Sequence, residues 1–300
     1  MIPSLVRVCI HFFFRLPDPT VLMCHAVRLS AFVLWLGIIA SAPVSHAQSS
    51  YDLFGSARAD ALGHSTTASP STTGVHANPA ARAPTSDVTA VFYARQSFGL
   101  SALRYGASHV TVPFGWGAVS AGASTFGFDE YREVHLSGGY ARSFAFGTTR
   151  RAHLGIAIRY HHTSIPSYGN AGALGVNAGV MVRLLRSLQL GAHATNVNGP
   201  SLVDGEPLPR TLAVGLNYRA LKQLRVLADV FKDVRFPLSV RGGLEIRPVS
   251  ALALRAGVTT APVRFTGGAG IRLGRLRAHV AVEQHQELGW SPSASLRVQW

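Results

Sequence analysis

The sequence predicts an all-β fold: a single transmembrane antiparallel β-barrel of about 14 strands, preceded by a short N-terminal plug segment. Three observations lead to this prediction. Apolar and polar residues alternate from residue 88 to the end, an export signal precedes the alternating region, and the last residue is the aromatic Trp300. Alternation with a period of two is what a strand with one apolar and one polar face produces.

The last segment shows the alternation most clearly. Leu296, Val298 and Trp300 share one face, and Arg297 and Gln299 share the other. The same pattern recurs along the chain between short polar or glycine-containing joints, as expected for successive strands. It predicts strands near residues 88–98, 102–112, 116–126, 132–144, 152–161, 173–184, 188–196, 210–219, 225–233, 238–247, 251–259, 263–273, 276–284 and 292–300.

The joints between these strands differ in length at the two ends of the predicted barrel. Every second joint is tight, as at 113–115, 248–250 and 274–275. The long joints all fall among the others, at 162–172, 197–209 and 284–291. Bacterial outer-membrane barrels have short periplasmic turns and longer outer loops, so the pattern favours that class.

An apolar run at 29–43 follows Arg28 and precedes Ser45-His46-Ala47, which places small residues at −3 and −1 of a cleavage position. This predicts a secretory signal peptide over residues 1–47, with Met23 as an alternative start. The run is shorter than the ~20 residues of a spanning helix, which weighs against a membrane anchor. No later run is long and apolar enough either, so a membrane-embedded mature chain must be a barrel.

Cysteine content and charge exclude several classes of function. Cys9 and Cys24 both precede the cleavage position, so the mature chain has no disulfide, cysteine nucleophile or thiolate metal site. The formal charge is +14, and removing residues 1–47 takes away three arginines and one aspartate, which leaves +12. Nucleic acid is not an expected partner, because the chain is exported and its arginines are dispersed singly along alternating segments.

Periodicity alone does not tell which face points inward. A soluble barrel would bury its apolar face, whereas a membrane barrel turns that face to lipid and lines its lumen with polar residues. The export signal, Trp300 and the many glycines on the polar face favour the membrane version, because glycines would leave lumen volume that a soluble core fills. A strand that ends on an aromatic residue also resembles an assembly signal, so Trp300 is the candidate contact with the barrel-assembly machinery.

Charged residues on the polar face are the candidates for lining the lumen. Arginines outnumber acids there; the excess could bias an open lumen toward anions, belong to a packed interior, or gather at the periplasmic end. The candidates are Arg159, Arg219, Asp229, Arg241, Glu245, Arg255 and Arg272.

No catalytic group stands out, and we expect no enzyme activity, no metal and no cofactor. His153, His161 and His162 are close in sequence but lack a carboxylate at a defined spacing, so lining the lumen is the favoured role. Asp229 and Asp233 share a strand face, as active-site carboxylates would, but structural ion pairs with the arginines are the favoured interpretation.

Residues 48–87 have no alternation and are rich in Ser, Thr, Ala and Pro. The stretches Gly55-Ser56-Ala57-Arg58, Ala61-Leu62-Gly63 and Asn78-Pro79-Ala80 resemble the opening of the PorV/PorQ family and, more distantly, of FadL-type transporters of hydrophobic compounds. Short motifs further on, at 98–100, 127–133 and 254–257, resemble the same family. The resemblance departs at Ser65–Thr73, which replaces an acidic stretch, and at Ala81, where a glycine is usual.

The resemblance implies that residues 48–87 form a hatch inside a fourteen-stranded barrel comprising residues 88–300. Its motif residues are Gly55, Arg58, Gly63, Asn78, Pro79 and Ala80.

Two functional classes follow from the resemblance. The favoured one is a secretion-associated, type IX-like barrel that binds or shuttles exported proteins, because a mature chain this short leaves little sequence for an external lipid-capture site. The alternative is a FadL-like transporter of hydrophobic small molecules. In both, the expected location is the outer membrane of a Gram-negative bacterium. The expected partners are outer-membrane lipid, the assembly machinery, and either secreted cargo or a hydrophobic ligand.

Overall fold

The computed structural model describes residues 55–70, 77–146, 150–166, 169–203 and 206–300. The predicted signal peptide at 1–47 lies outside the described residues, as do positions 48–54 and 71–76 of the predicted plug. Among the described residues, no helix has the length and hydrophobicity needed to cross a membrane.

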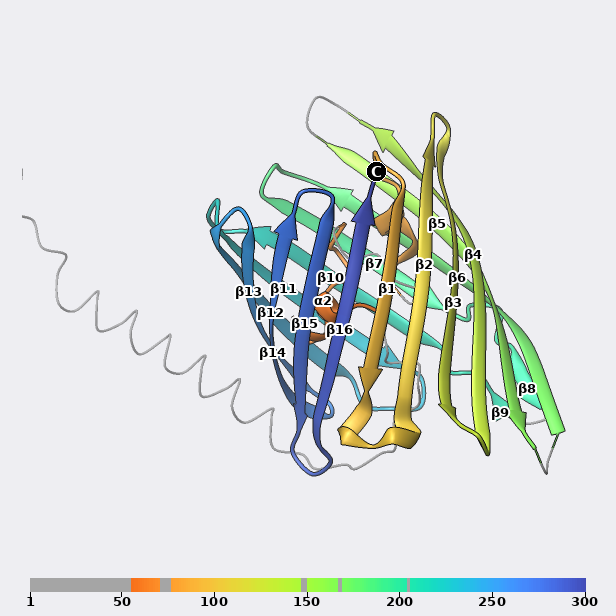
Figure 1. Ribbon diagram of the computed structural model, residues 1–300. Helices are drawn as coiled ribbons and strands as arrows, with labels where there is room; N and C mark the ends of the chain where they lie inside the picture. Colours follow the sequence, from red (N-terminus) through yellow and green to blue (C-terminus); the bar gives the residue numbers. More distant parts are fainter. Residues whose placement is uncertain (1–54, 71–76, 147–149, 167–168, 204–205) are drawn as a thin grey trace, which may run out of the picture. The chain divides into compact units, whose positions relative to one another are not determined.

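Fourteen antiparallel strands of the described chain close into a barrel (Figure 1), which confirms the predicted fold class and strand number. β1 (Thr89–Gln96) pairs with β2 (Arg104–Phe114) on one side and with β16 (Gly289–Gln299) on the other, and so closes the sheet. The other wall strands are β3 (Gly117–Phe128), β4 (Tyr131–Ala145), β5 (Arg151–Ile165), β6 (Gly169–Arg183), β7 (Leu188–Thr195), β10 (Thr211–Arg219), β11 (Leu224–Asp233), β12 (Ser239–Val249), β13 (Leu252–Thr260), β14 (Val263–Leu273) and β15 (Leu276–His285).

The wall carries its large apolar side chains on the outer face and its polar side chains on the inner face. On β5, Leu154, Ile156 and Ile158 are each about half exposed, at 49%, 48% and 50%, while the alternating Arg159 and His161 are buried. Most large apolar side chains lie on the outer face in this way, and the buried set is dominated by alanine and by polar or charged residues. A soluble protein would bury the apolar face, so the wall is built to meet lipid and the barrel spans a membrane.

The two ends of the barrel differ in their connections. At the end where the C-terminus lies, drawn at the top of Figure 1, the connections whose residues are all described are 115–116, 184–187, 220–223, 250–251 and 274–275. We call this the turn end, and the opposite one the loop end. At the loop end, residues 97–103 form the short helices η3 (Ser97–Gly99) and η4 (Ser101–Leu103), and residues 196–210 contain a small hairpin of β8 (Ser201–Val203) and β9 (Glu206–Pro207).

Two of the three predicted long loops are wrong. β5 and β6 continue far enough to leave only 166–168 between them, and β15 and β16 leave only 286–288. Thr163 and Ser164 of β5 pair with Ala171 and Asn170 of β6. The hairpin there carries polar and small residues on both faces, so alternation ends before the strand pairing does.

Toward the loop end, a loop replaces a wall strand beside β6. Only Ala178–Arg183 of β6 pair with β7. Beyond them the Val197 N–H donates to the carbonyl of Val176 at 2.9 Å, and the Asn198 Oδ1 accepts from the Val176 N–H at 2.8 Å. The 196–210 connection therefore satisfies backbone groups that a longer β7 would otherwise pair.

Candidate functional site

Residues 55–70 and 77–84 lie inside the barrel, and we refer to them as the plug. The plug and the wall belong to one compact unit of the chain. The short helix α2 (Ala57–Asp60) packs against β14, β15 and β16, and the turn η2 (Pro79–Arg82) packs against β4, β5 and β6. Almost every plug residue is buried, so the plug fills the lumen between these two sides of the wall (Figure 1).

Glycines of the wall let the plug backbone approach the strands. A Cβ added at Gly243 would lie 2.6 Å from the Leu62 carbonyl oxygen, and one added at Gly191 would lie 2.6 Å from the Thr67 carbonyl oxygen. The other wall glycines whose added Cβ would meet the plug are Gly155, Gly179, Gly257 and Gly268. The volume that these polar-face glycines leave in the lumen is therefore filled by the plug.

Gly63 is the matching glycine on the plug side. Its φ of +59° is a left-handed conformation that favours glycine, and an added Cβ would lie 2.8 Å from the backbone nitrogen of Val258. Its own N–H donates to the Thr266 Oγ1 at 3.0 Å. A turn and a close approach to the wall thus both require glycine at this position.

One buried carboxylate, Glu245 of β12, joins the plug to the wall. Its Oε2 accepts from the Nε of Arg58 at 3.1 Å and from the Nε of Arg255 at 2.9 Å. Its Oε1 lies 2.9 Å from Arg247 Nη2 and 3.8 Å from Arg225 Nη1. Four guanidinium groups therefore share one fully buried carboxylate, and one of the four belongs to the plug.

A second cluster holds the other side of α2. His64 Nε2 lies 2.7 Å from Glu283 Oε2, and Arg95 Nη2 donates to Glu283 Oε1 at 2.7 Å. Asp60 accepts from the hydroxyl groups of Tyr93 at 2.7 Å and Ser293 at 2.6 Å. Sequence reasoning missed this cluster. Glu283 could have been found on the polar face of its predicted strand, but Asp60 and His64 lie in a segment without periodicity.

Asn78 orders the far side of the plug. Its Oδ1 accepts from the Ala80 N–H at 3.0 Å and so caps η2, while its Nδ2 donates to the Thr67 carbonyl at 2.8 Å. The Nδ2 also lies 3.3 Å from the carbonyls of Val180 and Ala192 in the wall. One amide therefore connects two plug segments with two wall strands.

Asp229 and Arg82 complete this side of the plug. The Asp229 Oδ2 accepts from the Thr67 N–H at 2.8 Å, and the Arg82 Nε donates to His109 Nε2 at 3.1 Å. Burial, and to a smaller extent the charge of Arg159, lowers the pKa of Arg82 to about 10, so the guanidinium stays charged at neutral pH. The plug therefore carries a buried positive charge at each end, on Arg58 and on Arg82.

Two cavities open at the turn end. One, of about 40 Å³, lies beside Arg58 and the ends of β12, β14, β15 and β16. The other, of about 210 Å³, is lined by Arg183, Arg219 and Arg225 among others. Both are smaller than the ~300 Å³ of a typical small-molecule pocket, so neither accommodates a ligand of that size in this conformation.

No protein-family model matches the chain, and no curated protein matches it in sequence. Solved structures do match. The toluene transporter TodX of Pseudomonas putida is 12% identical with a TM-score of 0.55, over 84% of this chain and 98% of that chain. A FadL homologue of Pseudomonas aeruginosa is 10% identical with a TM-score of 0.53, over 82% and 98%.

The chain shares the fold of FadL-like outer-membrane barrels. A TodX deltaS2S3 mutant, described as a monoaromatic hydrocarbon channel, agrees with this: it is 13% identical with a TM-score of 0.58, over 83% of this chain and 99% of that chain. At such identities the similarity establishes the fold alone. It does not distinguish PorV/PorQ members from other barrels of the FadL-like fold.

The predicted lumen residues fall into three groups within this FadL-like fold. Asp229, Glu245 and Arg255 are buried and contact the plug or its ion-pair partners, as described above. Arg219 and Arg272 lie at the turn end and line the two cavities. Arg159 and Arg241 are buried in the wall, and the Arg241 guanidinium lies 3.7 Å above the centre of the Phe231 ring.

The remaining predicted positions lie at the edges of the plug and the barrel. Gly55 is buried, with a φ of +71°. Trp300 is exposed, and its backbone exchanges two hydrogen bonds of 3.1 Å with Val88, next to the seam between β1 and β16. Among the described residues, no group of three His, Cys, Asp or Glu side chains is placed to hold a metal ion.

We expect Asn78→Asp to loosen the far side of the plug. The carboxylate keeps the cap of η2 but cannot donate to Thr67, and it turns a negative charge toward backbone carbonyls, which costs about 1–3 kcal/mol. Hydrogen exchange at residues 77–82 should rise about tenfold or more, since 1.4 kcal/mol corresponds to a factor of ten. Asn170→Asp, on the exposed end of β6, is the control and should leave exchange in the plug unchanged.

Proposed function

We propose that the protein is a plugged transport barrel in the outer membrane of a Gram-negative bacterium, which admits small hydrophobic molecules and uses its plug as the gate. The observation that carries this proposal is a lipid-facing barrel whose lumen is filled by its own N-terminal segment. The fold adds support, because TodX is a toluene transporter and has the same fold. The plug and the small cavities are consistent with a closed resting state.

The chemistry of the contacts between plug and wall suits a gate. Arg58, Asp60, His64 and Asn78 hold the plug through ion pairs and hydrogen bonds, and Leu62 is the only large apolar side chain among the described plug residues. Water can replace polar contacts when they break, so their net contribution to stability is small compared with their number. The free-energy cost of undocking a polar plug from a polar lumen is therefore lower than the cost of undocking an apolar plug from an apolar one.

Single-channel recording tests the gate directly. The refolded protein in planar bilayers should stay mostly closed, and a variant lacking residues 48–87 should show stable openings. Uptake of radiolabelled toluene by cells that express the intact protein, compared with cells that carry an empty vector, tests the cargo class. A barrel that conducts equally with and without the plug, or cells without added uptake, would contradict the proposal.

A secretion-associated role of the PorV/PorQ type is the second candidate, and the loop end is the observation that favours it. Apart from 97–103 and 196–210, the connections at this end are five residues or fewer, which leaves little structure for capturing a hydrophobic ligand outside the membrane. If the barrel conducts neither with nor without the plug, the short loop end becomes the candidate docking surface for exported proteins.

A further inference from the structure

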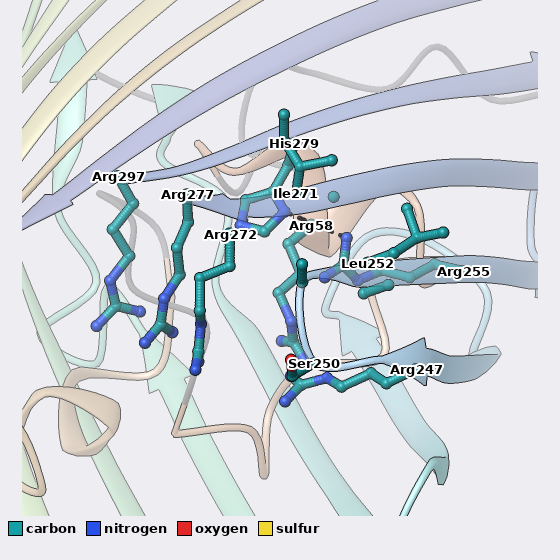
Figure 2. A pocket seen from close by; sticks show the side chains of 13 residues that line it. Arg58, Arg247, Ser250, Leu252, Arg255, Ile271, Arg272, Arg277, His279 and Arg297 are labelled. Carbon is teal, nitrogen blue, oxygen red and sulfur yellow. Dashed lines mark hydrogen bonds between the residues drawn. The ribbon is translucent and has the colours of Figure 1, made fainter. Parts of the chain in front are cut away.

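The smaller cavity at the turn end has an unusual lining (Figure 2). Thirteen residues surround it; six of them are arginines and none is acidic. The arginines come from the plug and from five wall strands: Arg58, Arg247, Arg255, Arg272, Arg277 and Arg297. Figure 2 shows the side chains of Arg272, Arg277 and Arg297 extending side by side, with their guanidinium groups at one level.

The strand register places three of these arginines directly opposite one another. Arg272 of β14 is paired with Arg277 of β15, and Arg277 is paired with Arg297 of β16. Like charges at directly opposed positions of a sheet destabilise it. A row of three therefore has a cost in the folded state unless an anion lies among the guanidinium groups.

The described residues supply no such anion to Arg272 or Arg277. Glu245, the nearest carboxylate in the ion-pair network, is already shared by Arg58, Arg225, Arg247 and Arg255. Neither Arg272 nor Arg277 forms an ion pair or side-chain hydrogen bond within the described part of the chain. Positive charge thus accumulates at the cavity, while Glu245 is committed to holding the plug.

We propose that this cavity binds a phosphate group, carried by a small solute or by a lipid headgroup that reaches the turn end. Guanidinium forks from three adjacent strands present more donors than a carboxylate with two oxygens can use, whereas a phosphate group has three strong acceptor oxygens and up to two negative charges. A volume of about 40 Å³ admits one such group and leaves the rest of the ligand outside in the mouth of the barrel. The site does not depend on whether the barrel conducts.

Calorimetry with inorganic pyrophosphate tests the proposal on the full protein refolded in octyl glucoside, a detergent without phosphate, in Tris buffer. Sodium chloride at matched ionic strength controls for screening. The test variant is Arg272→Gln combined with Arg277→Gln. The control is Arg275→Gln, because Arg275 lies in the same turn, is exposed and does not line the cavity. A parallel arm measures retention of phosphatidylglycerol against phosphatidylcholine after detergent washing.

We expect pyrophosphate to bind the wild type and the Arg275 variant alike, and to bind the double variant at least about tenfold more weakly. We also expect the double variant without ligand to melt no lower than the wild type, since it loses like-charge repulsion. If pyrophosphate does not bind but phosphatidylglycerol is retained over phosphatidylcholine, and this retention needs Arg272 and Arg277, the phosphate comes from lipid. Equal binding by the double variant, or no binding beyond that of chloride in either arm, would overturn the proposal.

Discussion

Glu245→Gln should release the plug while the wall still forms. The substitution keeps the size of the side chain but removes the one negative charge that Arg58, Arg225, Arg247 and Arg255 share. Removing one partner of a buried ion pair costs about 3–5 kcal/mol, because the remaining charges stay buried without compensation. Of the three wall arginines, Arg225 and Arg247 are partly exposed, so water can compensate their charges, whereas Arg255 is as buried as Arg58. The cost therefore falls on Arg255 and Arg58, and the part that falls on Arg58 weakens docking of the plug.

Trypsin measures this release, because it cuts after Arg58, which is buried in the docked plug. The cleavage rate at Arg58 should rise by about two to three powers of ten, as the free-energy change implies. The control is Glu287→Gln in the exposed connection between β15 and β16, which should behave like the wild type. If Glu245→Gln leaves Arg58 as protected as before, the cluster does not hold the plug.

A second variant separates loss of the plug from loss of the barrel. Adding Arg58→Gln to Glu245→Gln removes the buried plug charge that has lost its partner, so part of the docking should return. Cleavage after Arg82 then reports whether the plug is seated, because residue 58 is no longer a trypsin site. Electrophoretic mobility without heating reports whether the barrel is folded in each variant.

Gly243→Val should unseat the plug by steric means alone. The first carbon of the new side chain would lie 2.6 Å from both the Leu62 carbonyl oxygen and the Ser65 Oγ. Overpacking at a tight contact typically costs about 1–3 kcal/mol, and valine adds two further methyl groups in the same direction. In planar bilayers the variant should open far more often than the wild type.

The neighbouring glycine is a matched control for this experiment. Gly242 faces the other side of the same strand, and its added Cβ would meet nothing closer than the Val258 side chain at 3.7 Å. Gly242→Val should therefore leave the plug seated and the bilayer current closed. Equal opening by both variants would indicate general damage to β12, and equal closure would show that the plug can shift around the larger side chain.

The sequence predicted the wall well because each strand carries its own signal. Leu154, Ile156 and Ile158 alternate with inward residues, and this pattern needs no knowledge of the partner strand. The alternation ends where a strand extends beyond the part of the wall that carries apolar side chains on its outer face. For this reason the sequence predicts a loop at 162–172, where β5 and β6 in fact continue. Both faces of that hairpin carry small or polar side chains, and composition alone cannot separate such a hairpin from a loop.

The site was only partly predictable, for a different reason. Glu245 was a lumen candidate and Arg58 a plug motif residue, but 187 positions separate them and no local pattern joins them. Likewise, the sequence placed Gly243 and Gly257 on the polar face without indicating that Leu62 and Gly63 pack on them. Periodicity assigns each residue to a face; it does not tell which residues from another segment lie against that face.

The hydrogen bond between Asp60 and Ser293, which joins the start of the described chain to its last strand, bears on the order of folding. α2 is made early in synthesis, yet it packs on β14, β15 and β16, the last strands to be made. Contacts so distant in sequence carry a large loop-closure entropy and form late. The plug therefore docks only after the end of the chain has been made, and closing the β1–β16 seam encloses it in the barrel.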